Sequence, residues 1–181
     1  NLFIAFLRQI EKFSYKTAKG IISNLKDFPK YTDEYSIKIK KFHYSPNGIS
    51  ENTIPINKNY ISYSSKNILN GLSRLKSSGK MIIGYIGGLA SANAMDLFIE
   101  TAFNAKNDDN LFFIIVGDGQ LKKDLEKKCL DLNLQNIRFY DGVPKKEVPI
   151  IMESFDILFL AHQFKKIYSY GVSPMKLPEY I

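Results

Sequence analysis

The stretch "MIIGYIGGLASANAMDLFIETAFNAK" (81–106) decides the fold class. Its first seven residues form an apolar run of the kind found in strands that are buried on both faces. A glycine-containing loop follows, and Met95, Phe98, Ile99 and Ala102 then recur at helical spacing. The stretch therefore predicts a buried strand, a tight loop and an amphipathic helix, in this order.

The same order of elements recurs along the rest of the chain. Three further strands are predicted by apolar runs at 111–117, 136–140 and 156–160. Amphipathic stretches at 120–132 and 145–155 predict the helices between them, and Pro174 opens a last helix. Continuous apolar strands that alternate with helices are typical of a parallel sheet covered on both faces. The sequence therefore predicts an α/β domain with a doubly wound, Rossmann-like parallel sheet.

The residues before 80 show a different pattern, with shorter elements. The predicted elements are an amphipathic helix at 1–19, short strands at 20–23 and 41–45, a broken helix at 24–35 and a helix at 65–76. The apolar side of the first helix either lies on a membrane surface or packs against a sheet outside this chain.

A Pro46-Asn47-Gly48 turn marks the change between the two patterns. We therefore assign residues 1–47 to the remnant of one domain, 48–79 to a linker with a helix, and 80–181 to a second domain. The first residue is not Met, and we expect the chain to be part of a longer protein.

Composition and charge narrow the class of protein. Apolar residues make up 45% of the 181 residues and charged residues 24%, as in globular proteins. The longest early apolar run, Leu2 to Leu7, is too short to cross a membrane. The net charge of +7 favours acidic partners such as phosphates. Nucleic acid is disfavoured as a partner, because only Arg8, Arg74 and Arg138 supply the planar forks that read bases.

The chain has one cysteine, Cys129, and two histidines, His43 and His162. With these residues, neither a disulfide framework nor a metal cluster of familiar spacing is expected. A protein of the reducing cytosol fits this composition. Leu125 and Leu132 place Cys129 on the apolar side of a helix, so we expect a buried thiol.

In doubly wound sheets, ligands bind at the loops that follow the carboxyl ends of the strands. The loop after the first strand contains Gly87 and Gly88, which allow a phosphate to approach the backbone closely. The next loop contains Gly117-x-Gly119, but Lys122 stands where a dinucleotide-binding loop has its third glycine. A nicotinamide cofactor is therefore not expected.

The loop after the third strand contains Gly142 and Val143. Their backbone groups are candidates for hydrogen bonds to the edge of a base. For this loop, as for the two glycine-containing loops before it, the alternative is a tight turn that needs glycine for its conformation alone.

The last candidate region lies near the C-terminus. Ser173 is suited to cap the helix that Pro174 opens. Lys176 adds a positive charge beside the free N–H groups of the helix start, a combination that suits a diphosphate. Glu179, on the same side of the helix, is suited to accept hydrogen bonds from two ribose hydroxyls. The alternative is a Lys–Glu surface pair on an ordinary helix.

Five stretches, taken together and in this order, carry a family resemblance. They are "YKTAKGIIS…KFHYSPNGIS", "GYIGGLASANAMDLFIETA", "FIIVGDGQLKKDLE", "IRFYDGVPKKEVPIIMESFDILFL" and "YGVSPMKLPEYI". The chain resembles the glycosyltransferases of family four, and within them the bacterial surface-polysaccharide branch. The resemblance implies the GT-B fold, with an incomplete C-terminal donor domain and a stub of the N-terminal acceptor domain.

The resemblance also implies roles for single residues. It places Gly87 and Gly88 in the family's glycine-rich loop, Gly142 and Val143 at the base, and Glu179 at the ribose.

Two departures from the family stand out. Members usually have a first glutamate where this chain has Gly171, and many have a lysine in the helix that here begins with "ASANAMD". Lys176 is the residue that would supply the missing charge.

The implied activity is transfer of a sugar from a nucleotide diphosphate sugar to a saccharide or lipid-linked acceptor in lipopolysaccharide or capsule synthesis. The family needs no metal or cofactor for it and usually retains the anomeric configuration. The resemblance implies a cytoplasmic protein, either free or peripheral to the inner face of the plasma membrane. With an incomplete acceptor domain, the chain by itself is expected to be inactive. The alternatives are a sugar-nucleotide epimerase of the same fold and a non-catalytic member, the latter suggested by Gly171.

Overall fold

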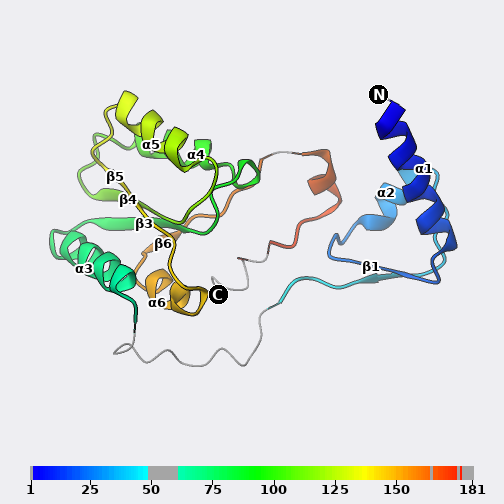
Figure 1. Cartoon of the computed structure of the whole chain (residues 1–181), viewed down its shortest axis with the longest axis horizontal. Helices are drawn as coiled ribbons and strands as arrows, with labels where there is room; N and C mark the ends of the chain where they lie inside the picture. Colours follow the sequence, from blue (N-terminus) through cyan, green and yellow to red (C-terminus); the bar gives the residue numbers. More distant parts are fainter. Residues whose placement is uncertain (1, 49–60, 164, 175, 177–181) are drawn as a thin grey trace. The chain divides into compact units, whose positions relative to one another are not determined.

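The computed structural model describes residues 2–48, 61–163, 165–174 and 176 (Figure 1). These residues form two compact units. One unit comprises 2–48 with 165–174 and 176, and the other comprises 61–163.

The unit at 61–163 is built on a four-stranded parallel sheet. Its strands are β3 (Met81–Ile86), β4 (Leu111–Val116), β5 (Ile137–Tyr140) and β6 (Ile157–Leu158). They lie in the order β5-β4-β3-β6, and every pairing is parallel. All four strands lie where the apolar runs predict them, so the parallel sheet is confirmed.

Helices cover both faces of this sheet (Figure 1). The helices are α3 (Tyr63–Ser77), the short turn η2 (Ser91–Asn93), α4 (Met95–Asn104), α5 (Lys122–Asp131), the turn η3 (Lys145–Glu147) and α6 (Val148–Met152). Figure 1 shows α4 and α5 on one side of the strands and α3 and α6 on the other.

Side chains of β4 point alternately to the two faces, as the strand period requires. Phe113 and Ile115 join the core with α4 and α5, whereas Ile114 and Val116 join the core with α3 and α6. All four side chains are fully buried. Burial on both faces explains why the strand is a continuous apolar run rather than an alternating one, and the doubly wound fold is confirmed.

The predicted helix at 145–155 is shorter and is divided. A 3-10 turn at Lys145–Glu147 precedes α6, which ends at Met152. Pro149 lies in the first turn of α6, where its missing N–H breaks no helical hydrogen bond. A helix that ran through from 145 would need that N–H, so the proline sets the start of α6.

Cys129 lies on the buried side of α5, as its neighbours predict. It packs in the same core cluster as Phe98 and Phe113. Burial raises the pKa of the Cys129 thiol to about 11. The thiol is therefore protonated at neutral pH, as expected for a residue that serves packing.

The other unit contains a separate two-stranded sheet. Its elements are α1 (Leu2–Thr17), β1 (Ile21–Ser23), α2 (Phe28–Glu34), β2 (Phe42–Tyr44) and the 3-10 turn η4 (Lys166–Tyr170). Strands β1 and β2 pair with each other in parallel, so the described residues 2–45 do not enter the four-stranded sheet.

Turn η4 packs against α2 within this unit. The ring of Tyr170 meets the ring of Tyr31 edge-on at 5.3 Å. The Tyr170 hydroxyl donates a hydrogen bond to Glu34, and the backbone N–H of Asp27 donates to the Tyr170 carbonyl at 2.7 Å. These contacts group residues 165–174 with the N-terminal residues.

The compact units differ from the sequence-based division of the chain. That division places 80–181 in one domain and makes 48–79 a linker with a helix, whereas helix α3 packs on β3 in the sheet-bearing unit. The amphipathic pattern identifies α3 as a helix, but it does not show which sheet the helix covers. Assignment of the parts to an acceptor and a donor domain stays a prediction.

Helix α1 leaves its apolar side chains exposed within its unit. Phe3, Phe6 and Phe13 are each more than 60% exposed. Both expectations for this face, a membrane surface and a missing sheet, stay predictions. Among the described residues, none of the helices combines the length and the apolarity that a membrane crossing requires.

Candidate functional site

The candidate site of the sheet-bearing unit is the edge where the parallel strands end. Loops leave this edge after β3, β4 and β5, and they carry Gly87 and Gly88, Gly117 and Gly119, and Gly142 and Val143. Parallel pairing aligns Ile86 with Val116, and Val116 with Tyr140. The structure therefore brings four of the candidate residues, Gly87, Gly88, Gly142 and Val143, to the same edge of the sheet.

The loop after β3 holds Gly88 through its carbonyl oxygen. The Tyr85 hydroxyl donates to this oxygen at 2.7 Å, and the Asn93 side-chain amide donates at 2.8 Å. A Cβ at Gly88 would meet no atom within 4 Å, so there is open space beside the backbone here. The loop leads into α4, whose N-cap Ala94 makes no side-chain capping bond to the first N–H groups of the helix.

The loop after β4 packs tightly against the loop after β3. The Gly87 N–H donates to the Val116 carbonyl at 2.9 Å, and the Leu89 N–H donates to the Asp118 carbonyl at 2.8 Å. A Cβ at Gly117 would come closer than 3.0 Å to the Gly87 carbonyl oxygen. The close contact between the two loops therefore explains by itself why position 117 is a glycine.

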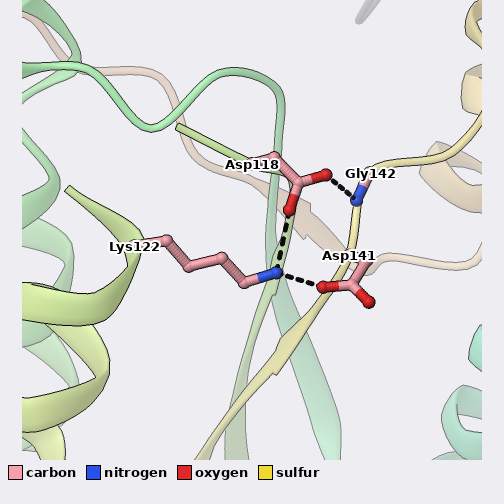
Figure 2. A network of polar contacts seen from close by, with 4 residues as sticks. All are labelled: Asp118, Lys122, Asp141 and Gly142. Carbon is pink, nitrogen blue, oxygen red and sulfur yellow. Dashed lines mark hydrogen bonds and ion pairs between the residues drawn. The ribbon is translucent and has the colours of Figure 1, made fainter. Parts of the chain in front are cut away.

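A network of charged side chains joins the ends of β4 and β5 (Figure 2). Asp118 follows β4, and one of its carboxylate oxygens accepts the backbone N–H of Gly142 at 2.7 Å. Its other oxygen accepts a hydrogen bond from the Lys122 ammonium at 3.0 Å. The ammonium also donates to Asp141, which follows β5. Lys122 is the first residue of α5, so a helix start and two strand ends are linked.

The network favours the charged forms of Asp118 and Lys122. Hydrogen bonds from Lys122 and from the Gly142 N–H hold the pKa of Asp118 below its ordinary value. Burial opposes the charge of Lys122, but the hydrogen bonds to Asp141 and Asp118 outweigh it and raise its pKa. The Lys122 side chain is only 16% exposed, against 62% for Asp118 and 85% for Asp141.

Glu147 anchors the far end of the loop after β5. Its side chain is buried, and one carboxylate oxygen accepts hydrogen bonds from the hydroxyls of Ser62 at 2.6 Å and Ser65 at 2.7 Å. The same oxygen accepts the Ser62 backbone N–H at 3.1 Å. Ser62 is the N-cap of α3, so the loop is tied to the start of that helix.

Sequence reasoning missed Asp118, Asp141 and Glu147, and it treated Lys122 as a departure from a glycine pattern, not as a site residue. One signal was available: Asp118 and Asp141 each follow a predicted buried strand directly, so both belong at the carboxyl edge.

The hydrogen bond of Asp118 to Gly142 also changes the expectation for the base. The Gly142 N–H is already occupied, which leaves its carbonyl and Val143 as the candidate groups.

Of the C-terminal candidate residues, Ser173 and Lys176 lie in the other unit. The Ser173 hydroxyl accepts a hydrogen bond from the Asn47 backbone N–H at 2.7 Å. Lys176 is helical, as predicted. Glu179 lies outside the described residues, so its ribose-binding role stays a prediction.

Gly171 has a structural reason to be glycine. Its φ of +113° is one that other residues rarely adopt, and a Cβ would lie 2.8 Å from the Lys26 backbone nitrogen. In this conformation a glutamate would be strained at position 171.

A hollow of about 440 Å³ opens on another part of the sheet-bearing unit, between α3 and β5. It is lined mainly by polar and basic side chains, including Asn67, Asn70, Arg74 and Arg138. Its lining does not include the candidate glycines, so we keep it separate from the site at the strand ends. Within the described ranges, no three His, Cys, Asp or Glu side chains gather so that they could hold a metal ion.

A doubly wound parallel sheet with glycine-containing loops at its carboxyl edge defines a class, the Rossmann-like α/β domains. The family follows from the sequence. Residues 73–175 match the family described as "Glycosyl transferases group 1". The matched residues make up more than half of the chain. The protein belongs to this glycosyltransferase family.

Solved structures with a similar fold include several glycosyltransferases. WaaG, described as a glycosyltransferase involved in lipopolysaccharide biosynthesis, has 17% identity and a TM-score of 0.58, covering 90% of this chain and 44% of its own. Anabaena Alr3699/HepE in complex with UDP and glucose has 16% identity and a TM-score of 0.62. The match covers 86% of this chain and 41% of the HepE chain. A variant of S. aureus TarM in complex with fondaparinux, alpha-GlcNAc-glycerol and UDP has 17% identity and a TM-score of 0.59. The match covers 86% of this chain and 28% of the TarM chain.

At these identities the similarity supports the fold, which is that of the GT-B glycosyltransferases. The chain spans less than half the length of each of these three structures. No curated protein sequence matches the chain.

Proposed function

We propose that the protein transfers a sugar from a nucleotide diphosphate sugar to a hydroxyl group of a saccharide or lipid-linked acceptor. The observation that carries the proposal is the family match over residues 73–175, which includes every glycine-containing loop at the strand ends. Ligands of doubly wound sheets bind at this edge. We further propose that the protein is a member of family four in the bacterial surface-polysaccharide branch, with a role in lipopolysaccharide or capsule synthesis.

The diphosphate of the donor is assigned to the loop after β3. The open space beside Gly88 would admit a phosphate oxygen close to the backbone. The first N–H groups of α4 lack a side-chain cap and carry partial positive charge, which favours an anion. On the family resemblance, Lys176, Ser173 and Gly171 are proposed as further donor-binding residues, with Lys176 as the source of a positive charge.

The nucleoside is assigned to two regions. The Gly142 carbonyl and the Val143 amide are proposed to hydrogen-bond the base, because Asp118 already accepts the Gly142 N–H. Glu179 is proposed to accept hydrogen bonds from the ribose hydroxyls, which a carboxylate can do with its two oxygens.

The proposed reaction makes the nucleoside diphosphate the leaving group. Its negative charge grows as the bond to the sugar breaks, so a helix start and a lysine stabilise the transition state more than the ground state. We propose that the anomeric configuration is retained and that no metal or cofactor takes part.

Residues 1–47 are proposed to belong to the acceptor domain and 80–181 to the donor domain, with 48–79 between them. The proposed setting is the cytoplasm, where the protein is either free or peripheral to the inner face of the plasma membrane. Because a transfer needs donor and acceptor held together, we propose that the described domains act only with a complete acceptor domain.

Glu179→Ala is expected to weaken nucleotide binding by about 1–3 kcal/mol, the usual loss for hydrogen bonds to a charged group. The measurement is calorimetric titration of the intact protein with UDP and with GDP. Glu100→Ala is a suitable control, because Glu100 is exposed in the middle of α4, outside the proposed donor-binding residues, and its replacement should leave the affinity unchanged. Equal affinities in wild type and Glu179→Ala would remove the ribose assignment.

A further inference from the structure

The loop that follows β5 is held at both of its ends. At the start, Asp118 accepts the Gly142 N–H at 2.7 Å. At the far end, buried Glu147 accepts hydrogen bonds from Ser62 and Ser65 at the start of α3. The backbone groups between these anchors, which include Val143, are therefore fixed relative to the sheet.

Lys122 adds the link that holds the first anchor in place. Its ammonium lies between the carboxylates of Asp118 and Asp141, which come from neighbouring strand ends (Figure 2). An aspartate held by a lysine cannot rotate away from the Gly142 N–H without losing an ion pair. The approach is close, since a Cβ at Gly142 would lie 2.8 Å from the Asp118 carboxylate.

Stability alone is a weak explanation for this arrangement. The Lys122 side chain is only 16% exposed, but both carboxylates face water, and ion pairs screened by water contribute less to folding free energy than buried ones. What the network does achieve is geometric. It fixes the loop after β5 to the loop after β4, at the edge of the sheet where ligands bind.

We propose that Asp118 and Lys122 are positioning residues for recognition of the nucleotide base. They hold the Gly142–Val143 backbone in the orientation in which it hydrogen-bonds the base edge, and they take no part in binding the diphosphate. The inference rests on the proposed nucleotide-sugar function and adds to it the residues that set base affinity.

The chain provides a matched control at the opposite edge of the sheet. Asp156 also accepts a backbone N–H, that of Ile82 at 2.7 Å, and also pairs with a lysine, Lys76 at 2.9 Å. Asp156 precedes β6 and Ile82 lies near the start of β3, so this second network is at the amino ends of the strands. Its loss removes the same kinds of bonds without touching the loop after β5.

The test compares binding of UDP and GDP with binding of inorganic diphosphate, by calorimetric titration of wild type, Asp118→Ala, Asp118→Asn and Asp156→Ala. In Asp118→Ala, affinity for the nucleotide that wild type prefers is expected to fall about tenfold, the effect of losing one ordering hydrogen bond. Affinity for inorganic diphosphate is expected to stay the same. Asp118→Asn keeps an oxygen that can accept the Gly142 N–H, so this variant is expected to lose less nucleotide affinity than Asp118→Ala. Asp156→Ala is expected to change neither affinity.

The outcomes separate the inference from the proposed function. If wild type binds neither nucleotide, the proposed function fails and the inference fails with it. Suppose instead that wild type binds a nucleotide. If Asp118→Ala then weakens binding of the nucleotide and of inorganic diphosphate equally, or weakens neither, only the inference is overturned. The same holds if Asp156→Ala weakens nucleotide binding as much as Asp118→Ala does. Should Asp118→Ala not fold, as judged by circular dichroism, Asp118→Asn and Lys122→Met carry the comparison.

Discussion

Gly117→Ala is expected to destabilise the sheet-bearing unit by about 3 kcal/mol, the upper part of the usual range for overpacking. The added Cβ would overlap the Gly87 carbonyl oxygen, which is backbone and not the tip of a flexible side chain. Gly87 cannot retreat easily, because its N–H is bonded to the Val116 carbonyl at 2.9 Å. Urea unfolding followed by circular dichroism measures the change in the free energy of unfolding.

Gly88→Ala is the control for this substitution. A Cβ at Gly88 would meet no atom within 4 Å, so the free energy of unfolding is expected to change by less than about 1 kcal/mol. If the loop binds a diphosphate as proposed, the same methyl group would occupy the space of the ligand and weaken nucleotide binding. A Gly117→Ala protein as stable as wild type would show that the two loops can separate without cost.

Glu147→Ala is expected to lower the free energy of unfolding by about 2–4 kcal/mol, because it removes several hydrogen bonds to a buried charged group. The Ser62 and Ser65 hydroxyls would lose their shared acceptor at the start of α3. Thermal and urea unfolding of wild type and Glu147→Ala at neutral pH provide the comparison. Ser65→Ala removes one of these bonds only and should have a smaller effect.

The contribution of Glu147 should also depend on pH. Burial alone would raise the pKa of this carboxyl, but the hydrogen bonds from Ser62 and Ser65 outweigh it and lower the pKa from 4.5. A carboxyl with a lowered pKa in the folded protein stabilises the fold above its ordinary pKa. That stability is lost as pH falls through the folded value. The stability gap between wild type and Glu147→Gln should therefore narrow below about pH 4.5. A gap that stays constant would rule out the charge as its cause.

The sheet was predictable from the sequence because its strands are buried on both faces. The runs at 81–87 and 111–117 contain enough apolar residues to be read as strands without any knowledge of their neighbours. The last strand is a partial exception, since the apolar run at 156–160 forms a pairing of only Ile157 and Leu158 with β3. In β6 the apolar run is therefore longer than the segment that pairs with the neighbouring strand.

The polar part of the site was much less predictable. The bond between Asp118 and Gly142 joins residues that meet only because β4 and β5 pair with Val116 beside Tyr140. Periodicity describes one element at a time and does not include such pairings. Glu147 shows the same limit, because its partners Ser62 and Ser65 lie far away in the sequence.

The strand order also has a consequence for the way the chain is made. β3 pairs Ile83 with Phe113 on one side and with Ile157 on the other, so the second pairing closes a loop more than twice as long as the first. Longer loops cost more entropy to close, and here only two residue pairs compensate for it. During synthesis, β3, β4 and β5 can therefore assemble before β6 leaves the ribosome, and pulse-labelled hydrogen exchange should find β6 protected last. Until then one edge of β3 stays open, and this is the stage at which nascent chains are most exposed to association with one another.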